Sequence, residues 1–320
     1  MKIFLTGATS FIGRYLAIEL VKRNHEVYAL VRPGSGNESK CDFRNIHVVR
    51  HDMNSIEEMS FNKFPRMDIF IHLAWAGEGA DDRMNEKIQR LNIKNTLNLI
   101  SLAQVTGCKR FIFAGSQAEY GVTLDRIGKK GFDRSYIYDE NLSCSPVSEY
   151  GKAKLRVLQN ACVLCEDMDM EYIHLRLFSI YGTGDHRNSL VSTCIRNLLE
   201  DKEVIFGKCT QLWNYLYVTD CASAIADLAQ CKFMSGRHEE AHVVNIASDT
   251  TRVLKDFVLD IEDVLGKKGK VLFTGKNDRK EGIPYLNPSI EKLKRLTGFK
   301  AGVDFNKGIQ LIRDAMLSEK

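Results

Sequence analysis

Three polar side chains have the types and the spacing that proton transfer requires. Tyr150 and Lys154 stand four residues apart in a stretch of helical period, so they share one helix face. A phenol with a pKa of about 10 needs a nearby cation to act at neutral pH, and Lys154 is placed to lower that value. Ser116 follows an apolar run, at the carboxyl edge of a predicted sheet, where its hydroxyl can bond the oxygen that Tyr150 protonates. We therefore predict Ser116, Tyr150 and Lys154 as catalytic residues.

A glycine-rich turn joins a predicted strand over 2–6 to a predicted helix over 11–22. Gly7 permits the tight turn, and Gly13 lets the helix approach the sheet closely. The free N–H groups and the positive dipole end at the helix start suit a pyrophosphate. The turn predicts a dinucleotide site, formed by Gly7, Thr9, Ser10, Phe11, Ile12 and Gly13.

The end of the second strand indicates which dinucleotide is bound. A protein that prefers NAD usually places an acidic residue there, to hold the ribose hydroxyl. This sequence reads Val31-Arg32 instead, and the Arg32 guanidinium can pair with a 2′-phosphate. We predict NADP as the cofactor, with NAD as the alternative.

The elements that position these residues alternate between short apolar runs and longer stretches of helical period. This alternation predicts an α/β fold: a Rossmann-type doubly wound parallel sheet with a smaller C-terminal α/β substrate domain. We place the domains at 1–177 and 178–320, with some later segments returning to the first. The expected strands are 2–6, 27–31, 46–49, 68–73, 110–114 and 172–177; the expected helices are 11–22, 84–105, 147–166, 189–200, 220–229 and 305–318.

Composition excludes several classes of function. Against 45 Lys and Arg stand 41 Asp and Glu, so a net charge of +4 gives no indication of a nucleic-acid partner. No apolar stretch is long enough to span a membrane, and the N-terminus lacks a secretory pattern, so we expect a cytoplasmic protein. Cys162 and Cys165 share a helix face and are expected to pack in the core. No metal site is predicted.

The sequence resembles the extended short-chain dehydrogenase/reductase family, the NAD-dependent epimerase/dehydratase group that modifies nucleotide sugars. The resemblance spans nearly the whole chain. It is carried by the 7–13 turn, His51-Asp52-Met53, His72-Leu73-Ala74, Asn92, Ser116, the Tyr150–Lys154 pair, Arg176-Leu177-Phe178-Ser179-Ile180-Tyr181-Gly182 and Tyr215-Leu216-Tyr217-Val218-Thr219-Asp220.

The resemblance implies roles for residues that spacing alone does not assign. Asp52 is expected to bond the adenine, and the backbone near Leu73 and Ala74 to face the cofactor. Tyr150 and Lys154 are expected to hold the nicotinamide ribose. Further cofactor contacts are expected from Met53, Trp75, Asn92 and Phe178, and substrate contacts from Ser116, Gln117, Ser179, Arg187, Trp213 and Arg279. Trp75 and Trp213 are equally compatible with plain core packing.

Departures from the family pattern narrow the chemistry. Dehydratases carry an Asp-Glu pair after the serine, where this chain has Gln117 and Ala118. Epimerases retain NAD through an acid after the second strand, where this chain has Arg32. Many relatives hold the substrate diphosphate with an arginine where this chain reads 212–215, Leu-Trp-Asn-Tyr; Arg279 is the best replacement.

The leading hypothesis is an NADPH-dependent reductase of a nucleotide-linked 4-keto-6-deoxy sugar, with Tyr150 as proton donor. The alternative is a nucleotide-sugar 4-epimerase with retained NAD. A remote alternative is a non-catalytic NADP-binding sensor, which usually lacks the tyrosine–lysine pair. By analogy with relatives, we expect a homodimer formed through the helices near 84–105 and 147–166.

Overall fold

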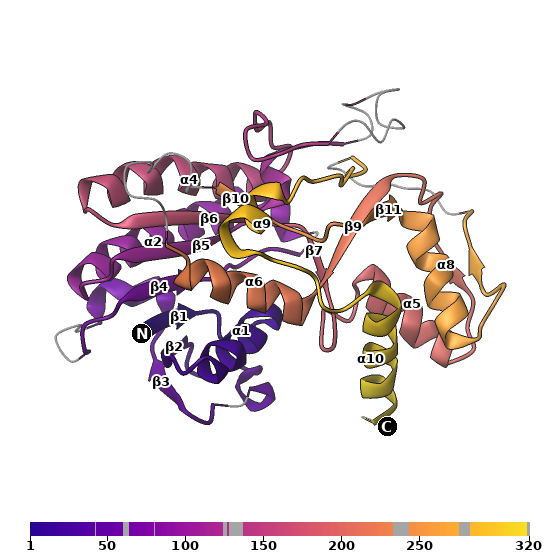
Figure 1. The fold of residues 1–320 in the computed structure, drawn as a ribbon, viewed down its shortest axis with the longest axis horizontal. Coiled ribbons are helices and arrows are strands. Elements are labelled where there is room, and N and C mark those ends of the chain that lie inside the picture. Colours follow the sequence, from indigo (N-terminus) through magenta and orange to yellow (C-terminus); the bar gives the residue numbers. More distant parts are fainter. Residues whose placement is uncertain are drawn as a thin grey trace.

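Seven parallel strands form the central sheet, in the order β10-β6-β5-β4-β1-β2-β3 (Figure 1). A computed structural model describes residues 1–41, 43–59, 64–79, 81–123, 127, 137–232, 243–274 and 282–318. The strands are β1 Lys2–Thr6, β2 Glu26–Val31, β3 Ile46–Arg50, β4 Ile69–His72, β5 Arg110–Ser116, β6 Glu171–Leu177 and β10 Val243–Ile246.

The middle strands are buried on both faces. Every residue of β4 and β5 is buried, as expected for nearly continuous apolar runs that helices cover on each side. β1 pairs with β2 on one side and with β4 on the other, so the strand order reverses at β1. The carboxyl ends of β1 and β4 therefore flank the switch point at which open α/β sheets bind ligands.

Two pairs of helices cover the sheet. α1 (Phe11–Lys22) packs against α6 (Val218–Gln230) on one face, and α2 (Glu86–Val105) packs against α4 (Glu149–Asp167) on the other (Figure 1). Arg23, at the end of α1, fixes α6 by donating to Asp227 at 2.6 Å and to the Ser223 hydroxyl at 2.8 Å. The two faces have separate hydrophobic cores, represented by Leu16, Leu20, Ile225 and Leu228 and by Leu99, Ile100, Val157 and Ala161.

The smaller part contains two short sheets and most of the C-terminal helices. β7 (Ser179–Tyr181), β9 (Leu212–Tyr217) and β11 (Thr251–Val253) form one sheet, and β8 (Val204–Ile205) pairs with β12 (Val271–Leu272). The helices of this part are α5 Leu190–Leu199, α8 Leu254–Leu265 and α10 Phe305–Ser318, whereas α9 Glu291–Thr297 packs on α6 and β10 of the larger part. The core shared by α5, α8 and α10 includes Cys194, Ile195, Val258, Ile261 and Ile309. Single turns of 3₁₀ helix lie at Glu38–Lys40, Asp82–Met84 and Gln117–Glu119, and a longer 3₁₀ segment, Met53–Glu58, is kinked at Ser55.

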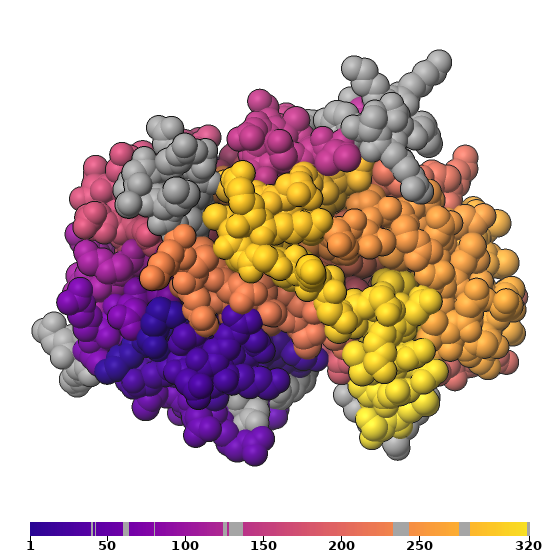
Figure 2. Space-filling model, in the orientation of Figure 1, coloured from indigo at the N-terminus to yellow at the C-terminus, as the bar shows by residue number. Residues whose placement is uncertain are grey.

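The structure confirms the predicted fold class. The helices predicted at 11–22 and 305–318 have those limits, and the other predicted elements differ by a few residues at their ends. Cys165 is buried on α4, and Cys162 packs against the same core. Three elements from beyond residue 177, α6, β10 and α9, join the larger part. The chain from 282 onward, yellow in Figure 2, crosses from the larger part to α10.

Candidate active site

The turn between β1 and α1 has no room for side chains at its two glycines. Gly7 has a φ of +77°, and a Cβ there would lie 2.7 Å from the Ala74 nitrogen. A Cβ on Gly13 would lie 1.9 Å from the Gly7 carbonyl oxygen. The Ser10 side chain accepts a hydrogen bond from the Gly13 N–H at 3.2 Å and so caps α1, whose first turn carries no acidic residue. The turn thus has the close packing and the polarity of an anion-binding helix start.

A buried histidine fixes the neighbouring strand end. His72 is fully buried between the hydroxyls of Thr6 (2.6 Å) and Thr96 (3.0 Å), and burial lowers its pKa to about 3. The imidazole is therefore neutral, and both of its nitrogens have partners. The Ala74 N–H donates to the same Thr6 hydroxyl at 3.3 Å. These bonds hold the predicted cofactor segment Leu73-Ala74 against the glycine turn.

Side chains of α2 brace the loop that follows β4. Asn92 donates to the Ala76 carbonyl at 2.8 Å and accepts from its N–H at 3.1 Å. The Trp75 indole donates to Gln89 at 2.9 Å, and Gln89 in turn donates to the Gly77 carbonyl at 2.8 Å. Two residues predicted as cofactor contacts, Asn92 and Trp75, thus shape this loop.

Ser116 and Tyr150 meet where β5 ends. Ser116 forms a capping box with Glu119: its hydroxyl accepts from the Ala118 N–H at 3.2 Å, and its own N–H donates to Glu119 at 2.7 Å. Tyr150, in the first turn of α4, is buried, and its phenol lies close enough to the Ser116 side chain for that hydroxyl to act on it by lowering its pKa. The structure therefore places the two hydroxyls near each other.

Lys154 lies beside this pair but points toward the sheet. Its Nζ donates to the Ala114 carbonyl at 2.5 Å and lies 3.7 Å above the centre of the Trp75 ring. The Tyr150 ring centre is 5.6 Å away. Burial lowers the pKa of Lys154 to about 7, against the opposing effects of Glu78 and Glu119.

One electrostatic expectation is wrong. The sequence suggested that Lys154 lowers the pKa of Tyr150, but burial, helped by Glu78, raises that pKa to about 12. Of the two cations over the phenol ring, Arg83 is the nearer, with its Cζ 4.3 Å from the ring centre against 5.6 Å for the Lys154 Nζ. The reason is geometric: the Lys154 ammonium is engaged with a backbone carbonyl and an indole ring.

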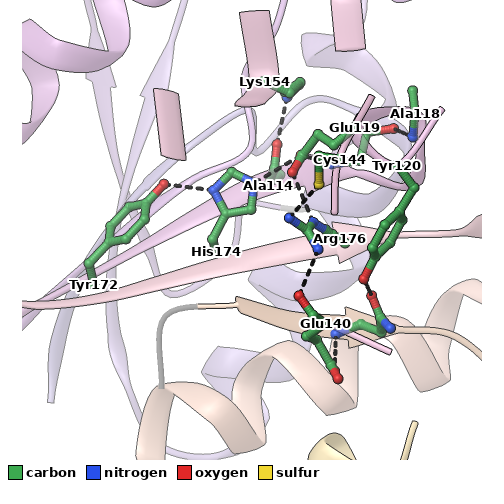
Figure 3. Close-up of polar contacts among 12 residues, drawn as sticks. Ala114, Ala118, Glu119, Tyr120, Glu140, Cys144, Lys154, Tyr172, His174 and Arg176 are labelled. Carbon is green, nitrogen blue, oxygen red and sulfur yellow. Dashed lines mark hydrogen bonds and ion pairs between the residues drawn. The ribbon is translucent and has the colours of Figure 1, made fainter. Parts of the chain in front are cut away.

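A buried ionic network includes Glu119, the residue that accepts from the Ser116 N–H (Figure 3). The Glu119 carboxylate bonds His174 at 2.9 Å and Arg176 at 3.0 Å, and all three side chains are buried. Burial would raise the pKa of Glu119, but His174 and Arg176 outweigh it and hold that pKa below its usual value. The network continues to Tyr172 on one side and to the Glu140 carbonyl on the other.

The remaining predicted cofactor residues lie around the switch point. Arg32 is exposed directly after β2. Asp52 caps the 3₁₀ turn after β3 by accepting from the Asn54 N–H at 2.9 Å, and Met53 packs against the core of that face. Phe178, by contrast, is buried, with its ring against Tyr120 and Tyr138, so its side chain belongs to the core.

The predicted substrate residues are distributed over both parts. Gln117 follows Ser116, and Ser179 begins β7, and both are partly buried. Arg187 is exposed before α5. Trp213 packs partly buried on β9, and its indole nitrogen has no partner among the described residues. Arg279 lies outside the described residues.

The turn that contains Gly7 and Gly13 shows whether a dinucleotide fits this site. Neither glycine can carry a Cβ, and the capped α1 start faces the segment 73–74, so the residues present fit a pyrophosphate-bearing cofactor. In the described part of the chain, no three His, Cys, Asp or Glu side chains are placed to hold a metal ion. No described helix has the length and apolar character needed to cross a bilayer.

A comparison with protein-family models assigns the chain. The model for the NAD dependent epimerase/dehydratase family matches residues 3–247. The chain belongs to this family. It is an NAD(P)-dependent enzyme of the extended short-chain dehydrogenase/reductase type, in the group that modifies nucleotide sugars, as the sequence predicted.

Individual family members resemble the chain over most or all of its length. An uncharacterized UDP-glucose epimerase of Bacillus subtilis, YtcB, is 26% identical, covering 97% of this chain and 96% of the relative. The dTDP-6-deoxy-L-talose 4-dehydrogenase (NAD(+)) of Aggregatibacter actinomycetemcomitans is 25% identical over 61% of this chain and 67% of its own. The UDP-glucose 4-epimerase structure from Thermotoga maritima has a TM-score of 0.85 at 21% identity and covers 100% of this chain and 99% of its own, which shows the shared fold.

Sequence reasoning missed several residues of this family member's site. The signal for Glu119 was present, because Ser116-x-x-Glu119 is a capping-box pattern. His174 and Arg176 alternate on β6, which places two polar residues on one face of a buried strand. No local pattern points to Arg83 or Glu78, which lie on the loop after β4.

Proposed function

We propose that the chain is an NADPH-dependent reductase that acts on the C4 keto group of a nucleotide-linked 4-keto-6-deoxy sugar. The observation that carries this proposal is the Ser116–Tyr150 pair at the carboxyl edge of the sheet. Because burial raises the pKa of Tyr150 to about 12, the phenol is protonated at neutral pH. A protonated phenol is the form that reduction of a ketone needs.

The chain's own groups supply proton transfer and orientation. Tyr150 donates its proton to the keto oxygen, and the Ser116 hydroxyl holds that oxygen by a hydrogen bond. The Glu119 capping box keeps the Ser116 backbone in place while the proton moves. When bound, NADPH supplies the hydride that completes the reduction.

The loops around the switch point support NADPH. Gly7, Gly13 and the start of α1 would hold the pyrophosphate, Asp52 the adenine, and Arg32 the 2′-phosphate. No acidic residue directly follows β2, where an NAD-retaining enzyme needs one. An exchangeable cofactor suits net reduction.

The names of the relatives support chemistry at C4 of a nucleotide-linked sugar. One is a 4-dehydrogenase of a dTDP-linked 6-deoxy sugar, and the Thermotoga structure is a UDP-glucose 4-epimerase. Dehydration is disfavoured because Gln117 and Ala118 offer no acid–base pair beside Ser116. Two of the predicted substrate contacts lie at strand ends: Gln117 directly follows Ser116, the last residue of β5, and Ser179 is the first residue of β7.

The similarity to 4-epimerases favours a second candidate, a nucleotide-sugar 4-epimerase that retains NAD. The cofactor content of the purified protein separates the two. Stoichiometric NAD released on denaturation would support the epimerase. The reductase is supported if the purified protein contains no dinucleotide and if NADPH raises its melting temperature more than NADH does.

Replacing the phenol tests the chemistry. We expect Tyr150→Phe to lose turnover of a 4-keto-6-deoxy sugar nucleotide with NADPH while keeping its affinity for NADPH, because only the proton donor is removed. Tyr28→Phe, in β2, is the matched control, because this phenol bonds Glu26, and the variant is expected to keep full turnover. Unchanged turnover in Tyr150→Phe would reject the assignment.

A further inference from the structure

Two loops bring charged side chains near Tyr150. The loop after β4 carries Glu78 and Arg83, and the loop before α5 carries His186; these three residues are called the rim. His186 Nε2 lies 3.2 Å from Glu78 Oε1, so this ion pair joins the two parts of the molecule. Arg83 stacks on the phenol ring, with its Cζ 4.3 Å from the ring centre.

The loop that holds Glu78 and Arg83 is fixed to α2 at the residue before each of them. Gln89 donates to the carbonyl of Gly77, next to Glu78, at 2.8 Å, and to that of Asp82, next to Arg83, at 3.3 Å. Gly77 has a φ of +69°, and a Cβ there would meet the Ile88 side chain at 2.8 Å. The rim charges therefore keep a defined place relative to α4.

Opposite charges on this rim act on the same two buried groups. Glu78 favours the protonated forms of both Tyr150 and Lys154, and Arg83 disfavours them. Tyr150 and Lys154 are more than nine-tenths buried, so water is largely excluded on their side of these interactions. The Glu78 side chain is 54% exposed, so water screens part of its effect, and it contacts its titratable partner His186 at the surface.

We propose that Arg83 and Glu78 are a pair of positioning residues of opposite sign that set the protonation balance of Tyr150 and Lys154, with His186 as the titratable partner of Glu78. The proposal rests on the proposed function in taking Tyr150 and Lys154 as the groups that carry the chemistry. It assigns the rim a role that neither the glycine turn nor the Ser116 network supplies.

Other groups near Lys154 and Tyr150 do not replace this pair. Glu119 also acts on both, but it is already bound to His174 and Arg176. Burial lowers the pKa of His72 to about 3, so its imidazole is neutral at physiological pH, and burial also lowers the pKa of His174, which is bonded to Glu119. Asp185 lies next to His186, and burial raises its pKa. Among the described residues, the Glu78–His186 pair is therefore the contact between the two parts that can titrate and that also acts on Lys154.

Lys154 provides a direct readout, because its pKa of about 7 lies in an accessible range. We would titrate the lysine Cε resonances of the full chain by NMR, with Lys154→Met to assign the signal. Arg83→Met removes a positive charge and raises the Lys154 midpoint, whereas Glu78→Gln removes a negative charge and lowers it. Each displacement is expected to be about one pH unit. His186→Gln exposes the Glu78 charge fully and raises the midpoint.

The control is the neighbouring ion pair Glu86–Arg90, on the exposed face of α2. Arg90→Met and Glu86→Gln are expected to leave the Lys154 midpoint unchanged. Displacements of the same sign in Arg83→Met and Glu78→Gln, or none in either, would overturn the proposal. Arg83→Lys, which keeps the charge, serves if Arg83→Met fails to fold, and is expected to displace the midpoint less than Glu78→Gln does.

The pH profile of turnover separates failure of this inference from failure of the proposed function. If both hold, the profiles of Arg83→Met and Glu78→Gln move in opposite directions along the pH axis. If the NMR midpoints move apart but no sugar nucleotide is reduced, the electrostatic pair stands and the proposed reaction falls. If turnover is normal and the midpoints do not move, the rim has no such role.

Discussion

Replacing Lys154 by methionine gives a stability change whose size and sign follow from the structure. The ammonium is buried, and burial lowers its pKa from 10.5 to about 7. Above pH 7 the folded protein releases this proton, while the unfolded chain keeps it until pH 10.5. The free energy of unfolding of the wild type therefore rises with pH across this window, relative to a variant without the group.

The magnitude comes from the difference between the two pKa values. Each pH unit contributes about 1.4 kcal/mol, so the full window of 3.5 units contributes about 5 kcal/mol. Between pH 7 and pH 9, the unfolding free energy of the wild type minus that of Lys154→Met should rise by about 2.3 kcal/mol, because the folded lysine is only half deprotonated at pH 7. At low pH the variant gains stability relative to the wild type, because the wild type must then bury a charge.

Denaturant unfolding of both proteins at intervals from pH 6 to pH 9 measures this difference. The nine cysteines and the tyrosines titrate in both proteins, so their contributions cancel in the comparison. Lys152→Met, on the exposed face of the same helix, is the matched control and should run parallel to the wild type. A parallel course for Lys154→Met as well would show that Lys154 stays charged in the folded protein and would refute the reasoning.

Two further perturbations test the cofactor turn and the outer helices. Gly13→Ala places a Cβ within 1.9 Å of the Gly7 oxygen, so we expect loss of NADPH binding by calorimetry and a lower melting temperature; Gly36→Ala, in open space, should change neither. We also propose a homodimer through α2 and α4, where Leu91 is 43% and Val163 59% exposed. Light scattering at micromolar concentration should give a dimer that Leu91→Asp dissociates; a wild-type monomer would contradict it.

The sequence was informative wherever a local pattern decides the structure. The glycine turn, the limits of α1 and the approach of Ser116 to Tyr150 all follow from period, spacing and strand order. The strands β7 to β12 are two to six residues long and carry little periodic signal, so the smaller part could not be drawn in advance.

The directions in which the site's side chains point, and the charges that surround them, were harder to predict, because both depend on residues that are distant in sequence. Lys154 shares a helix face with Tyr150, yet its ammonium is engaged by Ala114, 40 residues away. The nearer cation over the phenol ring, Arg83, lies on a loop with no recognisable motif. Spacing along a helix predicts which residues are neighbours, and the tertiary packing decides which atoms meet.

The placement of β10 beside β6 has a consequence for how the molecule is made. Until residue 246 has left the ribosome, β6 presents an open row of backbone N–H and C=O groups, and the surface of α1 that α6 covers is bare. The larger part therefore cannot complete its sheet during synthesis until β10 has been made. A chimaera joined at residue 177 would pair β6 with a β10 strand from the other parent. A joint after β10 would keep both strands from one parent.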